Sequence, residues 1–343
     1  EIAGRLQLAQ PVQQARDRGV TQIWATEWSP PAAYKSNNNL NNGGTLLTSH
    51  YQDYANYPAS YVKTLKSSYN VDLFALSPFN EPDYTTSYES SSVNGSQFLS
   101  FVRDYLGPTF ASQGLTTRIV IPEPSRNNLL ASLADPSLND ANAAKYLFAI
   151  GTHLYGAGPT AYPLAAAKGK EYWETEMSDF NPNDPGMGSG LQLAGWIHNS
   201  LAVANMNAFH FWWLINVNTD NEGLLDSSGN VTKRLYVMGN YSKFIRPGAT
   251  RIGAPASPAN NVDVSAYRNA NNGSLVIVAV NRNGSASSQT FNLNGVSAAS
   301  VIPWVTDGSR NLAQQSAAAL SGNSFSYSLP AQSVTSFVVS LSS

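Results

Sequence analysis

The chain has 343 residues, of which 42% are hydrophobic and 12% charged, and its formal net charge is −2. Roughly 150 residues per domain gives about two domains, or one barrel with an appendage, and the apolar content excludes a disordered chain. The near-neutral charge excludes a nucleic-acid partner, the lack of an apolar run of ~20 residues excludes a membrane span, and the absence of cysteine removes disulfides and thiolate sites.

The first two thirds of the chain alternate short apolar runs with longer helical patterns, which is typical of a parallel βα sheet. The runs are nearly continuous in apolar residues, as expected for strands buried on both faces. The predicted strands are residues 21–28, 71–79, 118–123, 146–155, 171–177 and 208–215. The predicted helices include 51–67, 96–113, 140–149 and 191–204, and the predicted loops include 36–44 and 180–190.

Six predicted strands are fewer than the eight of a (β/α)8 barrel, and a doubly wound open sheet can be built from six. Two features favour the barrel. No glycine-rich phosphate turn follows any predicted strand, and polar or aromatic residues stand at the carboxyl ends of nearly all six, where barrel active sites lie. We therefore expect an α/β fold whose first part is a TIM barrel.

The pattern changes after Gly248, where short strands separated by Asn, Gly and Ser turns replace the alternation. The predicted strands are residues 262–267, 275–281, 289–293, 301–305, 325–329 and 334–339. Short strands spaced about 10–15 residues apart are typical of an antiparallel sandwich or barrel. We expect a catalytic barrel domain over residues 1–248 and a β-sandwich side domain over residues 249–343.

Two glutamates at the carboxyl ends of predicted strands are the candidates for chemistry. Glu81 follows Asn80 directly after the second predicted strand, and Glu176 lies at the end of the fifth. Glu174 faces the same side of that strand because side chains alternate, and we expect it to be an ion-pair or hydrogen-bond partner. Two carboxylates facing one pocket are what glycoside cleavage needs, since one protonates the leaving oxygen and the other attacks the anomeric carbon or activates water.

Aromatic side chains and one histidine stand at or near the carboxyl ends of the same strands, where flat ring faces can stack on sugar rings. They are Trp28, His153, Tyr155, Trp212 and Trp213. Core packing is the competing interpretation of each ring taken alone, and the convergence of several on one rim favours a sugar site. Four histidines without paired spacing predict no metal, and no nucleophile-elbow motif supports a Ser/His/Asp triad. We expect no cofactor.

At these residues the sequence resembles glycoside hydrolase family 30. The segment ALSPFNEPDY at 75–84 is similar to the acid/base motif of that family, and four further segments match its motifs in the right order. They are WATEWSPP at 24–31, GTHLYG at 151–156, FWW at 211–213 and YSKFIRPG at 241–248. The similarity is greatest to the bacterial glucuronoxylan endo-xylanases and covers nearly the whole chain, the sandwich included.

The resemblance implies a (β/α)8 barrel with a side β-sandwich, and a retaining double displacement. It makes Glu81 the acid/base after the fourth barrel strand and Glu176 the nucleophile at the end of the seventh. In a retaining enzyme the two carboxyl groups lie about 5–5.5 Å apart, and the acid keeps its proton while the nucleophile is ionised. By the same resemblance, the sugar site is lined by Trp28, Asn80, Tyr155 and Trp213.

One departure from the family concerns the substrate. The glucuronoxylan enzymes carry an arginine just after the Trp-Trp pair, where it pairs with glucuronate, and a tyrosine pair after the nucleophile. Here residues 214–222 contain no basic residue, Ser178 and Asp179 replace the tyrosines, and Asp220 and Glu222 add negative charge. A glucuronate would gain no bidentate partner, so we hypothesise that the chain cleaves neutral xylan without depending on glucuronate.

A second departure is the strand count. The first two barrel strands of the family would precede Glu1, and one of them carries an arginine that helps to hold the charges of the site. If the chain begins at Glu1, an exposed strand edge flanks the gap and invites pairing with another copy. We expect a monomer, and if the barrel is open we expect reduced activity or a dimer.

We expect a secreted, endo-acting xylanase whose partner is a polysaccharide, with neither nucleic acid nor a membrane involved. Two alternatives stay open. One is another β-glycanase of the same family, such as a β-1,6-galactanase or glucanase. The other is a carbohydrate-binding remnant whose catalysis is weakened by the missing strands. Retention of both Glu81 and Glu176 favours an active enzyme.

Overall fold

The computed structural model describes residues 9–342, which form two compact units. The first unit ends at Glu176 and also contains Met206–Ala208, and the second comprises Met177–Asn205 and the chain from Phe209 onward. No helix within residues 9–342 has the length and apolar composition of a membrane span.

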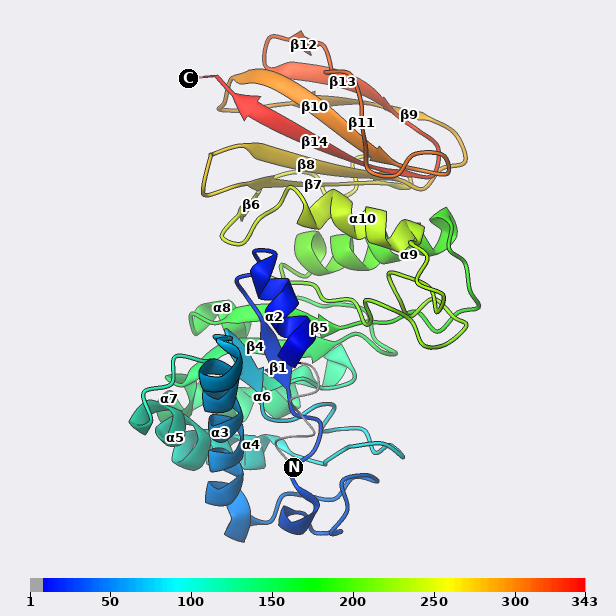
Figure 1. Cartoon of the computed structure of the whole chain (residues 1–343). Coiled ribbons are helices and arrows are strands. Elements are labelled where there is room, and N and C mark those ends of the chain that lie inside the picture. Colours follow the sequence, from blue (N-terminus) through cyan, green and yellow to red (C-terminus); the bar gives the residue numbers. More distant parts are fainter. Residues whose placement is uncertain (1–8, 343) are drawn as a thin grey trace. The chain divides into compact units, whose positions relative to one another are not determined.

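A curled parallel sheet is the centre of the first unit (Figure 1). Its strands are β1 (Trp24–Thr26), β2 (Ala75–Ser77), β3 (Arg118–Pro122), β4 (Leu147–His153) and β5 (Glu171–Glu176). They are hydrogen-bonded in the order β1-β2-β3-β4-β5, so their order in space follows their order in the chain. A doubly wound sheet reverses its strand order at a switch point, whereas a TIM barrel does not. The strand order therefore confirms a barrel-type sheet, of which these five strands make up about half.

Helices and short turns connect these strands. The helices are α2 (Ala9–Asp17), α3 (Tyr51–Tyr69), α4 (Gly95–Phe101), α5 (Gly107–Ser112), α6 (Leu130–Asn139), α7 (Ala141–Ala144) and α8 (Pro163–Ala167). A π-helical segment, η4 (Val102–Leu106), joins α4 to α5, and single 3-10 turns form η2 (Ala32–Tyr34), η3 (Thr48–His50) and η5 (Asn127–Leu129).

The predicted helices at 51–67 and 96–113 are confirmed, and local signals explain their limits. Tyr51, Tyr54, Ala55 and Leu65 of α3 are buried at helical spacing, and the helix ends where Asn70 takes a left-handed conformation with φ 52°. At the start of α4, Asn94 and Gln97 form a reciprocal capping box. The prediction for 140–149 is too long, since α7 is a single turn and the apolar run that follows enters β4.

The sixth predicted strand, at residues 208–215, is wrong as a strand. Ala208 makes one isolated parallel bridge to Trp173, and Phe211 makes another to Met177. Trp173 and Met177 are four residues apart, whereas Ala208 and Phe211 are three apart, so the register slips and no continuous ladder forms. An apolar, aromatic-rich composition predicts burial here, but it cannot specify register.

An antiparallel β-sandwich forms the C-terminal part of the second unit (Figure 1). One sheet has the order β11-β10-β14-β8-β7-β6 and the other β12-β13-β9. All six strands predicted after Gly248 are present, together with three short ones. The strands are β6 (Thr250–Ile252), β7 (Val262–Arg268), β8 (Leu275–Asn281), β9 (Ser287–Asn292), β10 (Ala298–Thr306), β11 (Ala313–Gln314), β12 (Leu320–Ser321), β13 (Ser324–Leu329) and β14 (Ser333–Leu341).

Helices α9 (Met187–His198) and α10 (Lys233–Ser242) pack against the sandwich, and a π-helical segment, η6 (Asn199–Val203), follows α9. Every residue of β8 is buried, because Val276 and Val278 face these helices while Leu275 and Ile277 face the sandwich core. This packing explains why the compact units divide after Glu176. The predicted domain boundary at residue 248 stays a prediction. The predicted loop at 180–190 is shorter than expected, since α9 begins at Met187.

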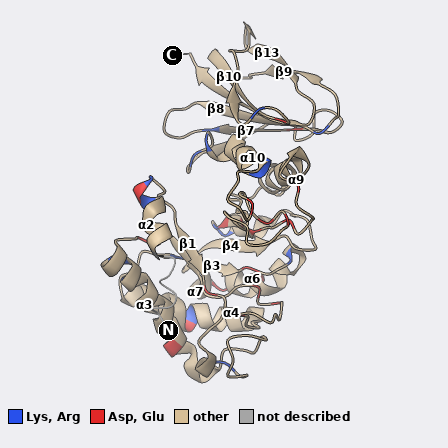
Figure 2. Cartoon of the chain, turned by 45° about the vertical axis from the view of Figure 1, so that its right-hand side comes forward, with Lys and Arg blue, Asp and Glu red and all other residues tan. Residues whose placement is uncertain are grey.

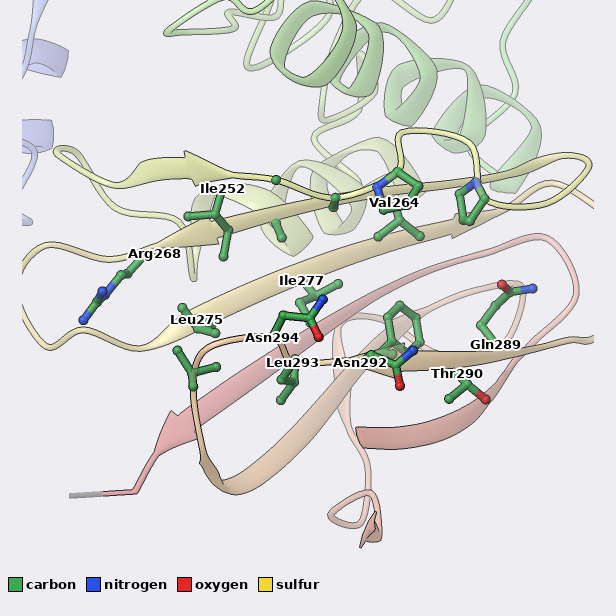
Figure 3. Close-up of a pocket in the computed structure, with 17 residues that line it drawn as sticks. Ile252, Val264, Arg268, Leu275, Ile277, Gln289, Thr290, Asn292, Leu293 and Asn294 are labelled. Atoms are coloured by element: carbon green, nitrogen blue, oxygen red, sulfur yellow. The ribbon is translucent and has the colours of Figure 1, made fainter. Parts of the chain in front are cut away.

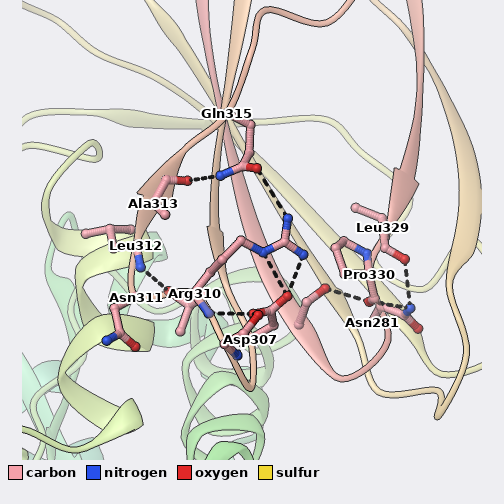
Figure 4. Close-up of polar contacts among 12 residues, drawn as sticks. Asn281, Asp307, Arg310, Asn311, Leu312, Ala313, Gln315, Leu329 and Pro330 are labelled. Atoms are coloured by element: carbon pink, nitrogen blue, oxygen red, sulfur yellow. Dashed lines mark hydrogen bonds and ion pairs between the residues drawn. The ribbon is translucent and has the colours of Figure 1, made fainter.

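Polar side chains fix the loops at one end of the sandwich (Figure 4). The Arg310 guanidinium donates to the Asp307 carboxylate, with Nε 2.9 Å from Oδ2, and also contacts Gln315. Asn281 at the end of β8 donates to the carbonyl oxygens of Leu329 and Pro330. These bonds satisfy backbone groups that the strand ladders leave unpaired.

Candidate active site

Glu81 lies in the first unit, four residues beyond the end of β2, and its side chain is almost fully buried. Its backbone takes the left-handed conformation, with φ 43°, and its amide donates a 3.0 Å hydrogen bond to the carbonyl oxygen of Glu123. A non-glycine residue with positive φ costs energy and persists where its surroundings require it. Asn80, directly before it, is also buried. The carboxyl group therefore has a defined position at the carboxyl end of the sheet.

Glu123 takes the corresponding place after β3 and is 1% exposed. It also has positive φ, 57°, and its amide donates to the Gly151 carbonyl oxygen in β4. Its Oε2 accepts a 2.8 Å hydrogen bond from Thr26 Oγ1 at the end of β1. Glu123 is absent from the predicted site, although Glu-Pro at the end of a predicted strand is the same signal that marks Glu81.

His153, the last residue of β4, lies between these acids and is 1% exposed. Its Nδ1 is 3.0 Å from Glu81 Oε1 and 3.8 Å from Glu176 Oε1, and its Nε2 is 3.8 Å from Glu123 Oε1. Burial alone disfavours the imidazolium, but the charges of Glu176, Glu123 and Glu81 outweigh it and raise the pKa of His153 well above its ordinary value. The raised pKa favours the protonated form of His153 among the three acidic side chains.

Glu176 completes the cluster at the end of β5, where Tyr155 Oη donates a 2.9 Å hydrogen bond to its Oε1. Burial raises the pKa of Glu176, His153 and the Tyr155 hydrogen bond oppose that rise, and the charges of Glu81 and Glu123 add to it. Burial and the neighbouring Glu176 also raise the pKa of Tyr155, so its hydroxyl keeps its proton and donates. Glu174 is fully buried inside β5, and its amide donates to the Ala208 carbonyl oxygen.

Glu81, His153 and Glu176 each place one ligand-type atom within 4.8 Å of the others, a grouping that could also hold a divalent cation. Two facts favour proton chemistry. His153 and Glu81 face each other at a hydrogen-bonding distance of 3.0 Å, and the Glu176 oxygen nearest to His153 already accepts from Tyr155. The prediction of a site without metal stays a prediction.

An aromatic pair lies on the loops of the same unit. The Trp28 ring, two residues beyond β1, is 5.5 Å from the ring of Tyr88, which is 44% exposed. Burial raises the pKa of Tyr88, and the negative charges of Glu81 and Glu176 raise it further. The Tyr88 hydroxyl is therefore close enough to both carboxyl groups to be affected by their charge. Sequence reasoning missed Tyr88 because it lies in a loop, away from any strand end.

Lys35 fixes the loop that carries Tyr88. Its side chain is buried, and its Nζ donates to the carbonyl oxygens of Leu40 and Ser90. Burial lowers the pKa of Lys35 to about 8. Backbone bonds from Asn42 to Thr86 and from Ser90 to Leu40 join the same two loops. The predicted loop at 36–44 therefore holds the segment around Tyr88 in place through these hydrogen bonds.

Trp212 and Trp213 belong to the second unit. The Trp212 amide donates to the Met177 carbonyl oxygen, and their rings lie 5.0 Å apart at 71°. Their role at the sugar site stays a prediction. In the loop that follows, Leu214, Ile215 and Val217 are 63%, 49% and 66% exposed.

Arg234 is buried beneath these loops of the second unit. Its guanidinium donates to the carbonyl oxygens of Gly223 and Asp184 and to the side chains of Ser189 and Asn221. Charged residues are sparse over the described chain (Figure 2), and this arginine is occupied inside the protein rather than presented to a ligand.

A pocket of about 550 Å³ opens at one edge of the sandwich (Figure 3). Its floor is apolar, with Ile252, Val264 and Ile277, and Arg268 lies at one end. It contains no carboxylate, histidine or lysine, so its lining offers no acid/base pair. The candidate chemistry therefore lies in the cluster at the carboxyl ends of β2 to β5.

The structure brings together part of the predicted set. Glu81, His153, Tyr155 and Glu176 form one contiguous group, joined by Glu123, while Asn80 and Trp28 lie on the adjoining chain segments of the same unit. The catalytic and sugar-binding assignments of these residues stay predictions.

Comparisons with known proteins agree with this architecture. Residues 5–175 match the glycosyl hydrolase family 30 TIM-barrel domain, and residues 248–337 match the glycosyl hydrolase family 30 beta sandwich domain. Glucuronoxylanase XynC of Bacillus subtilis (strain 168) is 35% identical over 328 residues, which cover 92% of this chain and 74% of that protein.

Solved structures are similar over almost the entire chain. The glycoside hydrolase family 30 subfamily 8 xylanase Xyn30A from Clostridium acetobutylicum superposes with a TM-score of 0.88 at 38% identity, covering 96% of this chain and 82% of that one. The catalytic domain of GH30 xylanase C from Talaromyces cellulolyticus gives a TM-score of 0.86 at 31% identity, covering 96% and 79%.

Proposed function

The chain belongs to glycosyl hydrolase family 30, and we propose that it is a retaining endo-xylanase that uses Glu81 as acid/base and Glu176 as nucleophile. The observation that carries this proposal is the carboxylate pair, of which one oxygen from each residue lies within 4.8 Å of the other. Retaining glycosidases place these groups about 5–5.5 Å apart, whereas inverting enzymes need about 6.5–9.5 Å to admit a water. The short separation therefore supports retention.

The proposed reaction has two steps. In the first, a carboxylate oxygen of Glu176 bonds to the anomeric carbon while Glu81 transfers its proton to the departing glycosidic oxygen. In the second, water attacks that carbon, Glu81 takes a proton from the water, and the bond to Glu176 breaks. Because Oε1 of Glu176 accepts the hydrogen bond from Tyr155, the attacking atom is Oε2 of Glu176.

Xylan is the proposed substrate because the similar proteins of known activity include xylanases. The aromatic pair of Trp28 and Tyr88 offers ring faces near the carboxylates, as a sugar chain requires. Cleavage within the chain, rather than from its end, belongs to the same proposal. A polymer of this kind is too large to enter a cell, so we place its cleavage outside the cell.

Independence from glucuronate is a further part of the proposal. No lysine or arginine occurs between Trp213 and Lys233, and the exposed residues just after Trp213 are apolar or neutral: Leu214, Ile215, Val217, Asn218 and Thr219. Arg234 is buried, with its Nε and Nη1 donating to groups inside the protein, and Lys233 Nζ donates to the Arg310 carbonyl oxygen and to Asn311. These loops present no free guanidinium for a bidentate contact with a glucuronate.

Product analysis on a panel of polymers tests the substrate. We expect soluble xylo-oligosaccharides from linear xylan, arabinoxylan and glucuronoxylan at comparable rates, and none from β-1,6-galactan or β-1,6-glucan. A strong preference for glucuronoxylan overturns glucuronate independence. Products from the β-1,6-linked polymers alone make the chain another glycanase of the family, and turnover equal to that of Glu176→Ala makes it a binding module.

Azide rescue tests the two carboxylate roles separately. With an aryl β-xyloside that needs no proton on its leaving group, Glu81→Ala with azide should give the β-xylosyl azide. Glu176→Ala with azide should give the α-anomer, because azide then replaces the nucleophile. Two rescued products of the same anomeric form contradict the assignment.

A further inference from the structure

We propose that Glu123 is a positioning residue that keeps His153 doubly protonated through both steps of the reaction, so that one imidazolium serves Glu81 and Glu176 in turn. This inference rests on the proposed function. It assigns a role to a carboxylate that neither the family resemblance nor the predicted site included.

The position of Glu123 is determined from several directions. Its backbone links β4 to Glu81, through the bonds to the Gly151 carbonyl oxygen and from the Glu81 amide. Its Oε2 accepts from Thr26, which leaves Oε1 facing His153 Nε2 at 3.8 Å. Solvent does not reach it, because only 1% of the residue is exposed. Glu123 is thus held in place as an acceptor on the Nε2 side of the His153 ring.

Both ring nitrogens of His153 face carboxylates. Nε2 faces Glu123, and Nδ1 faces Glu81 at 3.0 Å and Glu176 at 3.8 Å. A neutral imidazole carries a proton on one nitrogen only. A bare Nε2 would face Glu123, and a bare Nδ1 would have no proton to offer whichever of Glu176 and Glu81 is ionised, inside a dry site. Only the imidazolium can donate in both directions. Two neighbouring titratable groups act on the His153 ring less directly. Tyr155 donates its hydrogen bond to Glu176, and Glu174 lies within β5.

The proposed reaction moves negative charge between the two acids at Nδ1. Before glycosylation Glu176 is ionised and Glu81 carries its proton. In the glycosyl-enzyme the Glu176 oxygen is part of an ester and Glu81 is ionised. Nδ1–H can serve whichever of these two carboxylates is ionised without losing its own proton. Glu123 bonds to no reacting atom, so it is the carboxylate whose charge stays constant and balances the imidazolium in both states.

The decisive measurement is the titration of His153 in the substrate-free protein by ¹⁵N NMR. The chain has four histidines, and His153→Asn identifies the signal by its loss. In the wild type we expect an imidazolium that does not titrate between about pH 5 and pH 8, across the ordinary histidine pKa of about 6.5. In Glu123→Gln, which keeps the acceptor for Thr26 and loses the charge, we expect it to titrate within that interval.

Kinetics supply the second readout. Glu123→Gln should lower kcat/KM by about tenfold to a hundredfold at pH 7 and recover toward acid pH, where His153 is protonated again. Glu123→Asp should restore most of the activity because the charge returns. Glu171→Gln is the matched control, since it removes a carboxylate at the opposite end of β5 and should leave both readouts unchanged.

The outcomes separate this inference from the proposed function. A neutral His153 in the wild type at pH 7 overturns the inference, and that measurement applies even if Glu123→Gln fails to fold. An unchanged His153 titration and pH profile in a folded Glu123→Gln protein also overturns it. A failure on every xylan overturns the proposed function alone, because the NMR titration needs no substrate.

Discussion

The hydroxyl of Tyr155 donates a 2.9 Å hydrogen bond to Oε1 of Glu176, and this contact orients one of the two candidate catalytic carboxylates. The bond favours the ionised form of Glu176 and so opposes the rise in its pKa that burial causes. A nucleophile needs that ionised form. Tyr155 is therefore placed to raise the fraction of active enzyme.

Replacing Tyr155 with phenylalanine should lower kcat/KM and move the acidic limb of the pH profile to higher pH. A lost hydrogen bond to a charged group costs about 1.5–3 kcal/mol, which corresponds to a roughly tenfold to hundredfold loss. The measurement is kcat/KM as a function of pH. Tyr162→Phe is the matched control, since it removes another tyrosine–carboxylate bond, to Asp135, in the same unit. A profile that Tyr155→Phe leaves unmoved contradicts this role.

The wild-type profile carries its own prediction. Because the pKa of Glu176 is raised and its ionised form is the active one, activity should increase with pH through a midpoint above the ordinary glutamate value of about 4.3. An acidic midpoint at or below that value in kcat/KM would show that the buried environment does not control the nucleophile.

Tyr88 should contribute to binding rather than to chemistry. Tyr88→Ala should raise KM on xylan by about five- to tenfold, because a stacked aromatic face is worth roughly 1 kcal/mol or more. Its kcat on a short aryl xyloside should stay the same. Tyr88→Phe keeps the ring and should behave like the wild type. Equal losses in the two variants would mean that the hydroxyl, not the ring, matters.

Removal of divalent metal should leave activity intact. The Glu81, His153 and Glu176 group could accommodate a cation by spacing, but the proposed proton transfers require none. Dialysis against EDTA followed by a xylan assay checks this. A loss that added metal reverses would reassign the cluster as a metal centre.

The Asp307–Arg310 pair gives a stability prediction for the sandwich (Figure 4). Although burial opposes it, hydrogen bonds from Arg310 and from backbone amides lower the pKa of Asp307 to about 2. Such a carboxylate stabilises the fold above its unfolded pKa of about 3.9, and that contribution is lost as the pH falls through 2.

Asp307→Asn should therefore cost on the order of 1 kcal/mol at pH 7 and almost nothing near pH 2. Thermal unfolding at the two pH values measures the difference. Asp72→Asn is a control, because it removes an exposed carboxylate from the first unit, where the Asp72 side chain is 77% exposed. Equal destabilisation by Asp307→Asn at both pH values would contradict the linkage.

Much of the fold could be predicted from the pattern of apolar and turn-forming residues in the sequence. Continuous apolar runs predicted all five strands of the parallel sheet, and alternation with Asn and Gly turns predicted the main strands of the sandwich. The strand predicted at 208–215 is wrong. Its apolar composition indicates burial, but a strand also needs a continuous pairing register, and here the register slips by one residue. The helix predicted at 191–204 was expected to belong to the barrel domain, yet α9, which overlaps it, packs against the sandwich.

The sequence by itself determined which residue types stand at the ends of the strands, and with them the candidates Glu81, His153, Tyr155 and Glu176. A carboxyl group after a buried strand is visible in a linear pattern, because strands and turns are local. Tertiary structure alone decided that Glu123 joins them, and that one imidazole faces three carboxylates. Those contacts join residues from β2, β3, β4 and β5, and the charge of a buried group depends on every neighbour that folding brings within a few ångströms.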